Sequence, residues 1–195
     1  MTAFAHQLLN TLPEAQHGED SGLLLAEIAT NTRELLDLRD RDDQTCSDRT
    51  AKDLERQGRD LWNSCLRLVR QLDAQGTGQR QSKLLTRVRV LAFHMIAMGC
   101  ENLNRQTGHD EMNAAYLFNL AMTTVRYCAQ TDDLSPAGAI MQLGAGYLQK
   151  YKDMVHHGSA DAAQSRVFKL EADYSIMRMA LVCRGPFCCL DWTDI

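Results

Sequence analysis

Apolar residues recur at helical spacing along most of the chain between Asp48 and Val182, a stretch that contains a single proline, Pro136. Spacings of three and four residues place apolar side chains on one face of an α-helix. Four such segments lie in residues 84–182, separated by polar turns. The pattern predicts that these residues form two antiparallel helical hairpins, which start near Leu84 and Pro136.

Three helices are expected before these hairpins. Residues Thr2–Thr11 form a short helix that Pro13 stops, and a helix with a narrow apolar stripe covers Leu23–Leu38. A longer helix follows, with Thr45 or Ser47 as its N-cap, because a hydroxyl oxygen at this position accepts a hydrogen bond from a first-turn N–H.

The segment Leu84–Cys100 is apolar on nearly every side, with Arg87, Arg89 and His94 as its strongly polar residues. A helix of this kind is buried by neighbours on several sides. We therefore expect it near the centre of the core. Its expected packing residues are Leu84, Val88, Leu91 and Met95.

A later segment carries Ile140, Leu143, Gly144 and Tyr147, the spacing of the first half of the tetratricopeptide (TPR) signature. The glycine lets a second helix approach, and the larger residues fill the gap between the paired helices. Such repeats stack into binding surfaces and perform no chemistry themselves. The sequence predicts an all-α fold of antiparallel helical hairpins stacked as a TPR-like right-handed array.

The predicted repeats are long and degenerate, because the hairpin starts near Leu84 and Pro136 lie farther apart than the ~34 residues of a standard repeat. Tyr147 and Tyr151 lie one turn apart on the same helix. We expect them to pack inside the hairpin rather than to form a peptide-binding ladder.

Three regions are predicted along the chain. Residues 1–46 form an N-terminal helical segment with a charged flexible linker, residues 47–182 form the helical array, and residues 183–195 form an irregular tail. The last predicted helix is apolar around much of its circumference, whereas a terminal repeat normally has a polar outer face. We interpret the chain as an array that lacks its continuation, and we expect self-association through this apolar helix.

The composition is that of a folded globular protein, with 45% hydrophobic and 24% charged residues in a chain of 195. The formal net charge is -4. Basic residues are not segregated: residues 1–80 hold 10 Lys and Arg against 14 Asp and Glu, and residues 81–195 hold 11 against 11. Such a surface repels a phosphate backbone, so we expect no direct nucleic-acid partner.

The sequence contains no run of ~18 apolar residues, the length that a membrane span requires. The N-terminus lacks the basic leader and apolar core of a secretory signal. Seven cysteines without framework spacing indicate a reducing compartment. The expected location is therefore the nucleus or the cytoplasm.

The sequence predicts no catalytic, cofactor-binding or metal-binding residue. Cys183, Cys188 and Cys189, together with His156 and His157, carry the donor atoms that zinc prefers. Adjacent cysteines seldom both reach one tetrahedral ion, and no paired two-residue-gap motif is present. We therefore expect unpaired thiols in the tail and no bound metal.

Polar residues of the central helix have two interpretations. His94 lies among apolar residues without a nucleophile motif, which indicates a buried or boundary histidine rather than a catalytic one. Arg87 and Arg89, with Lys83, could hold an acidic partner, but solvent-facing charges at the end of a buried helix explain them equally well.

Two segments resemble a known family. Arg56–Gln71 reads RQGRDLWNSCLRLVRQ, and Lys83–Gly99 reads KLLTRVRVLAFHMIAMG after a short polar loop. An LWN-containing helix followed by an LL-x-RVRVLAF helix resembles the early region of a fungal meiosis-specific TPR family, the Zip-four or sporulation-specific twenty-two family. Lys169–Leu181 is similar to a helix that leads into further repeats in that family. The resemblance covers Asn31–Leu181, and family members are far longer than this chain.

The resemblance implies a scaffold without enzymatic activity that acts on meiotic chromosomes in the nucleus. The family brings other meiotic chromosome proteins together, and so promotes crossover formation and assembly of the synaptonemal complex. A general TPR-like adaptor in cytoplasmic trafficking or chaperone assembly is the alternative function. A small metal-dependent helical enzyme that uses the histidines and tail cysteines is a third hypothesis.

Overall fold

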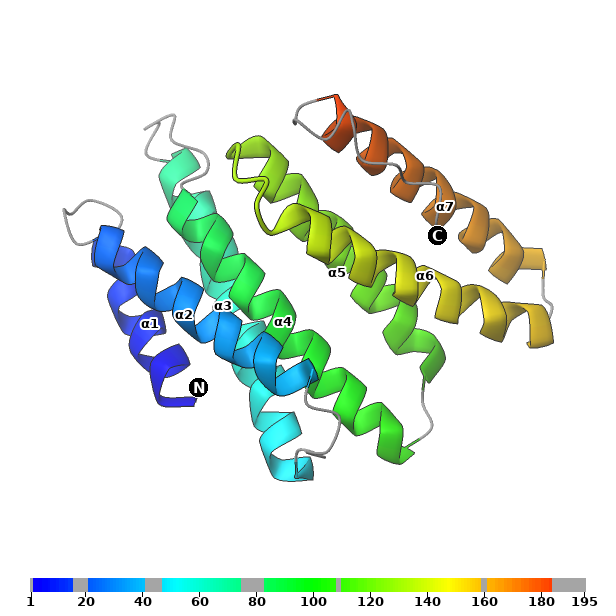
Figure 1. Cartoon of the computed structure of the whole chain (residues 1–195), viewed down its shortest axis with the longest axis horizontal. Coiled ribbons are helices and arrows are strands. Elements are labelled where there is room, and N and C mark those ends of the chain that lie inside the picture. The colour runs from blue at the N-terminus through cyan, green and yellow to red at the C-terminus, as the bar shows by residue number, and fades with distance from the viewer. Residues whose placement is uncertain are drawn as a thin grey trace. The chain divides into compact units, whose positions relative to one another are not determined.

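The computed structural model describes residues 2–15, 21–40, 47–74, 83–107, 110–158 and 161–183. These residues form seven α-helices and no strand, which confirms the predicted all-α fold (Figure 1). The helices are α1 (Thr2–Ala15), α2 (Ser21–Asp40), α3 (Asp48–Ala74), α4 (Lys83–Thr107), α5 (Asp110–Gln130), α6 (Ala137–Gly158) and α7 (Asp161–Val182). Stacking of hairpins as a TPR-like right-handed array stays a prediction.

The chain forms two compact units, Met1–His109 with α1 to α4 and Asp110–Ile195 with α5 to α7. This division falls inside the predicted array of residues 47–182. The helices of the predicted N-terminal segment, α1 and α2, belong to the first unit. Of the predicted charged linker, residues 41–46 lie outside the described residues, as does the predicted tail from residue 184 onward.

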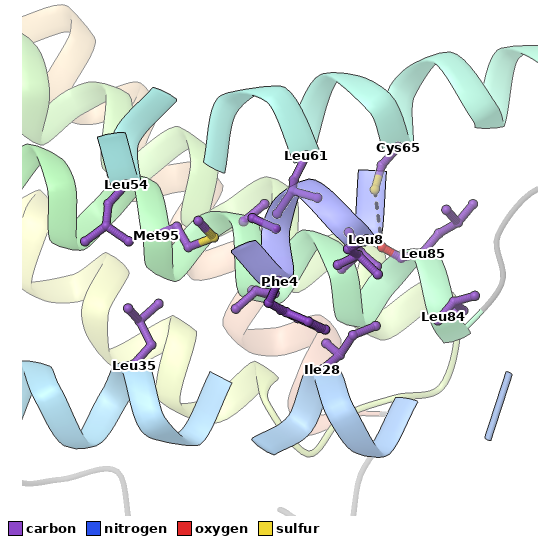
Figure 2. Close-up of a cluster of buried hydrophobic side chains, with 14 of the residues drawn as sticks. Phe4, Leu8, Ile28, Leu35, Leu54, Leu61, Cys65, Leu84, Leu85 and Met95 are labelled. Atoms are coloured by element: carbon purple, nitrogen blue, oxygen red, sulfur yellow. Dashed lines mark hydrogen bonds between the residues drawn. The ribbon is translucent and has the colours of Figure 1, made fainter. Parts of the chain in front are cut away.

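The core of the first unit forms between four helices. α3 and α4 pack along each other as an antiparallel hairpin, while α1 packs on α3 and α2 packs on α4 (Figure 1). Figure 2 shows buried side chains from all four helices meeting in one cluster. Each such Leu, Ile or Phe stabilises the fold by about 1.5–3 kcal/mol when it leaves water. Labelled members are Phe4, Leu8, Ile28, Leu35, Leu54, Leu61, Cys65, Leu84, Leu85 and Met95.

α4 lies at the centre of this unit, as its apolar pattern predicts. Every residue from Leu84 to Cys100 is buried except Arg87, which is half-buried. The predicted packing residues are all buried: Leu84, Val88, Leu91 and Met95. A half-buried ion pair joins α4 to α2, with Arg39 Nη2 2.6 Å from Glu101 Oε1.

Two glycines bring α3 and α4 close together. A Cβ added to Gly58 of α3 would lie 2.9 Å from the carbonyl oxygen of Ala92, and a Cβ added to Gly99 of α4 would lie 2.8 Å from the carbonyl oxygen of Ala51. Each helix therefore presents two small residues, seven positions apart, to the other helix: Ala51 and Gly58 on α3, and Ala92 and Gly99 on α4. The spacing of the hairpin depends on these glycines, because a backbone atom cannot move aside alone.

In the second unit, α5 and α6 form an antiparallel hairpin and α7 packs on both (Figure 1). The predicted polar turn between α5 and α6 is a C-cap: the Asp133 N–H donates to the Cys128 carbonyl at 2.9 Å, and Asp132 has a φ of 54°. This hydrogen bond across the end of a helix, with a left-handed residue inside it, is the Schellman motif. Asp tolerates the left-handed conformation better than most residues.

Gly144 of α6 lies at a close helix contact, as the TPR signature predicts, but the helix that it faces is α5. An added Cβ would lie 2.6 Å from Met122 Cε and 3.4 Å from Ala121 Cβ, both on α5. The predicted partner was the following helix, α7. The side of α6 that carries Gly144 therefore closes the α5–α6 hairpin.

The predicted helix pairing is confirmed only in part. The sequence pattern paired α4 with α5 and α6 with α7. In the structure α4 packs mainly with α3 and α5 packs mainly with α6, while α6 and α7 pack together as predicted but less extensively. Periodicity finds each apolar face but does not identify the face opposite it. The predicted stop of the first helix at Pro13 is also wrong, since α1 continues to Ala15. The cap at Ser47 is confirmed by its Oγ, which accepts from the Thr50 N–H at 3.3 Å.

Candidate interaction surface

α7 carries apolar side chains on two opposite faces. Val167, Leu170 and Met177 are buried within the second unit, where α7 packs on α5 and α6. On the outer face, Phe168 is 64%, Ile176 is 59% and Met179 is 60% exposed. The predicted apolar circumference of this helix is confirmed. Large exposed apolar side chains grouped on one face mark a surface suited to protein contacts.

A groove of about 860 Å³ runs between α6 and α7. Small residues on α6 leave this space: Gly146 lies in its lining, and a Cβ added there would meet no atom within 4 Å. Lys152 of α6 and Glu171 of α7 form an ion pair at 2.6 Å beside the groove. The sequence pattern did not predict this groove, because its width depends on tertiary packing. Gly146, a small residue on α6, is a local signal for it.

A second hollow, of about 410 Å³, lies along the C-terminal end of α7. Its lining combines apolar side chains with a guanidinium group. The lining residues are Tyr174, Ser175, Arg178, Met179, Val182 and Cys183. Together with the groove, it gives the second unit a surface with both apolar and charged contacts.

The other residues of the TPR-like pattern are structural. Ile140 and Tyr147 are buried, and Leu143 is half-buried. Tyr151 is buried as well. The prediction that the two tyrosines pack inside the hairpin is therefore confirmed, and they do not form an exposed peptide-binding ladder.

The structure corrects the prediction for the basic residues of α4. Lys83 is exposed and Arg87 is half-buried, but Arg89 is fully buried. Arg89 precedes Ala92 by three residues on the face of α4 that meets α3, and its charge acts on the Cys65 thiol of α3. Arg89 is therefore not a solvent-facing charge, and the three residues do not form one exposed basic patch.

His94 is a buried histidine, as predicted. Its ring lies edge to face on Phe93, with centroids 5.1 Å apart. Burial lowers the pKa of His94 to about 4, and the nearby Arg39 charge contributes a smaller part of this shift. The imidazole is therefore neutral at pH 7 and takes part in the core as an uncharged ring.

The buried thiols are poor nucleophiles. Burial raises the pKa of Cys65 to about 12, and the Arg89 charge offsets only part of that rise. Burial, followed by the Glu55 charge, raises the pKa of Cys100 to about 12. Because the thiolate is the reactive form, both thiols are inert at neutral pH.

The metal candidates in the tail lie mostly outside the described residues. Cys183 is exposed, while Cys188, Cys189 and the side chains of His156 and His157 are not described. Within the described ranges, no group of three or more His, Cys, Asp or Glu side chains is placed to hold a metal ion.

Comparisons with protein-family models, with curated proteins and with solved structures found no match. A search of the described helices for a membrane span found none that is both long and apolar enough.

Proposed function

We propose that this chain is a protein–protein interaction scaffold in meiosis, which acts on chromosomes in the nucleus. It promotes crossover formation and synaptonemal complex assembly by bringing other meiotic chromosome proteins together. It performs no catalysis and does not bind nucleic acid directly.

One observation carries this proposal. The two segments that resemble the Zip-four family, Arg56–Gln71 and Lys83–Gly99, lie on α3 and α4, which pack together as a hairpin. Gly58 and Gly99, which belong to these segments, make the close contacts of that hairpin. The residues of the resemblance thus form one packed structural unit, as a shared fold requires.

The surface of the second unit also supports a binding role. Exposed apolar side chains on α7 and the groove beside α6 offer contacts to protein partners. Buried thiols and a neutral buried histidine are what a structural core contains.

Expression timing and gene deletion test this proposal. We expect the transcript to be restricted to meiosis, and we expect deletion to reduce crossovers and to leave chromosomes without continuous synaptonemal complex. A tagged chain should form foci on meiotic chromosomes. Steady expression in vegetative cells, with normal crossover numbers after deletion, would contradict the meiotic role and favour a cytoplasmic adaptor.

A further inference from the structure

The outer face of α7 has the residue spacing of a helix-pairing seam. Ser165, Phe168, Ala172, Ser175, Met179 and Val182 follow one another at intervals of three and four residues. The first five are exposed and Val182 is half-buried. None of the six is charged. Alternating intervals of three and four define the a and d positions through which two helices pack side by side.

The hollow at the end of α7 has the shape that such packing uses. Four of its lining residues, Ser175, Arg178, Met179 and Val182, lie at positions i, i+3, i+4 and i+7. Four residues at this spacing surround the hole that accepts one side chain from a facing helix. A large exposed apolar side chain is therefore the natural occupant, and Phe168 on the same helix is of this kind.

We propose that the outer face of α7 pairs with the α7 of a second copy of this chain, in antiparallel orientation. Phe168 of each copy then enters the hollow around Met179 of the other copy. In this register Ala172 faces Ser175, and Ser165 faces Val182. Large side chains meet at Phe168 and Met179, and small side chains meet near the two-fold axis, where the helices approach most closely.

Charge complementarity favours the antiparallel register. Glu171 and Arg178 lie seven residues apart along the same edge of the seam. Antiparallel pairing brings Glu171 of each copy beside Arg178 of the other, whereas parallel pairing in register places Glu171 beside the uncharged Ile176. Glu171 keeps its contact with Lys152 in this arrangement, because a carboxylate accepts several hydrogen bonds.

The inference does not depend on the meiotic role. It concerns self-association through α7, which a scaffold in any compartment could use. α7 has 22 residues and is about 33 Å long. An interface of one helix pair lies at the small end of specific interfaces, so we expect reversible dimerisation.

Sedimentation velocity of the full chain tests the proposal, over about 1–200 µM, a range that suits a small interface. We expect a monomer–dimer equilibrium. Phe168→Glu should raise the dimer dissociation constant about 100-fold or more, because it removes a large apolar contact twice per dimer. Leu23→Glu is the matched control, since Leu23 is an exposed apolar residue of α2. It should leave the dimer unchanged.

A wild-type chain that stays monomeric at all concentrations would overturn the proposal, and so would an oligomer that Phe168→Glu leaves intact. Circular dichroism should show the same helix content in each variant. Met179→Glu changes the other side of the same contact and should weaken the dimer to the same extent. It replaces Phe168→Glu in the test if that variant folds poorly.

Disulfide trapping tests the register. A mixture of chains carrying Ala172→Cys with chains carrying Ser175→Cys should form the 172–175 disulfide, identified by mass spectrometry of the linked peptides. Parallel pairing would instead form 172–172 and 175–175 disulfides. That result would overturn the antiparallel arrangement.

Discussion

Gly99→Ala is expected to destabilise the first unit, although alanine favours helices. An added Cβ would lie 2.8 Å from each of three atoms of α3: the Ala51 carbonyl oxygen, the Glu55 nitrogen and the Glu55 Cβ. Carbon atoms pack favourably at about 3.5–4.0 Å, so relief requires α3 and α4 to separate by about 1 Å at this point. Overpacking of this kind typically costs about 1–3 kcal/mol.

Helix propensity offsets part of this cost. Replacing glycine by alanine in a helix contributes about 1 kcal/mol. Two of the three contacts are with backbone atoms, which places the overpacking cost in the upper part of its range, about 2–3 kcal/mol. The expected net loss is therefore about 1–2 kcal/mol, which lowers Tm by about 2–8 °C in a chain of this size.

Gly146→Ala is the matched control for thermal unfolding followed by circular dichroism. Gly146 lies inside α6 and has open space around an added Cβ. Its substitution should stabilise the protein by about 0.5–1 kcal/mol. A Tm for Gly99→Ala equal to or above the wild-type value, alongside a higher Tm for Gly146→Ala, would refute the close contact between α3 and α4.

Three further predictions follow from the described residues. Gly144→Leu should destabilise the protein by about 1–3 kcal/mol through overpacking against α5, whereas Gly144→Ala should cost much less because the flexible end of Met122 can move; equal Tm values for the two variants in thermal unfolding would contradict this. The pKa of His94 is about 4, below its ordinary value of 6.5, so its contribution to stability is present above pH 6.5 and falls by about 2–3 kcal/mol as the pH drops to ~4.5; His94→Gln should remove this part of the pH dependence in urea unfolding, and an unchanged slope would count against it. Iodoacetamide should label the exposed Cys183 in the native protein at pH 8 and should reach Cys65 and Cys100 only after unfolding, as peptide mass spectrometry can check.

Helices could be predicted from the sequence because their signals are local. The apolar run from Leu84 to Cys100 predicted the central buried helix α4. The hydroxyl groups of Thr45 and Ser47 predicted the N-cap of α3, which Ser47 forms. Partner choice between helices could not be predicted in this way, because it depends on which surfaces fit. The pairs Ala51 with Gly58 and Ala92 with Gly99 do carry that information, since small residues seven apart on two neighbouring helices indicate close approach.

The candidate surface was predictable only in part. The apolar circumference of α7 follows from its sequence, but the groove beside Gly146 follows from the distance between α6 and α7. For Arg89, the sequence-based prediction was wrong. A charged residue near a helix end predicts a solvent-facing side chain, yet its position relative to Ala92 places it against α3. The helical periodicity placed Arg89 on a buried face of α4, whereas its charge suggested a solvent-facing side chain.

The division at residue 109 has a consequence for how the chain folds during synthesis. Every helix that contributes to the core of the first unit ends before α5 begins. A ribosome therefore releases a complete four-helix core while α5 to α7 are still being made, and domains fold as units in this order. The helices α1 and α2 have already left the exit tunnel when α4 emerges, so they can cover the hydrophobic surfaces of α3 and α4 early. Nascent chains stalled after α4 has left the exit tunnel should already resist proteolysis.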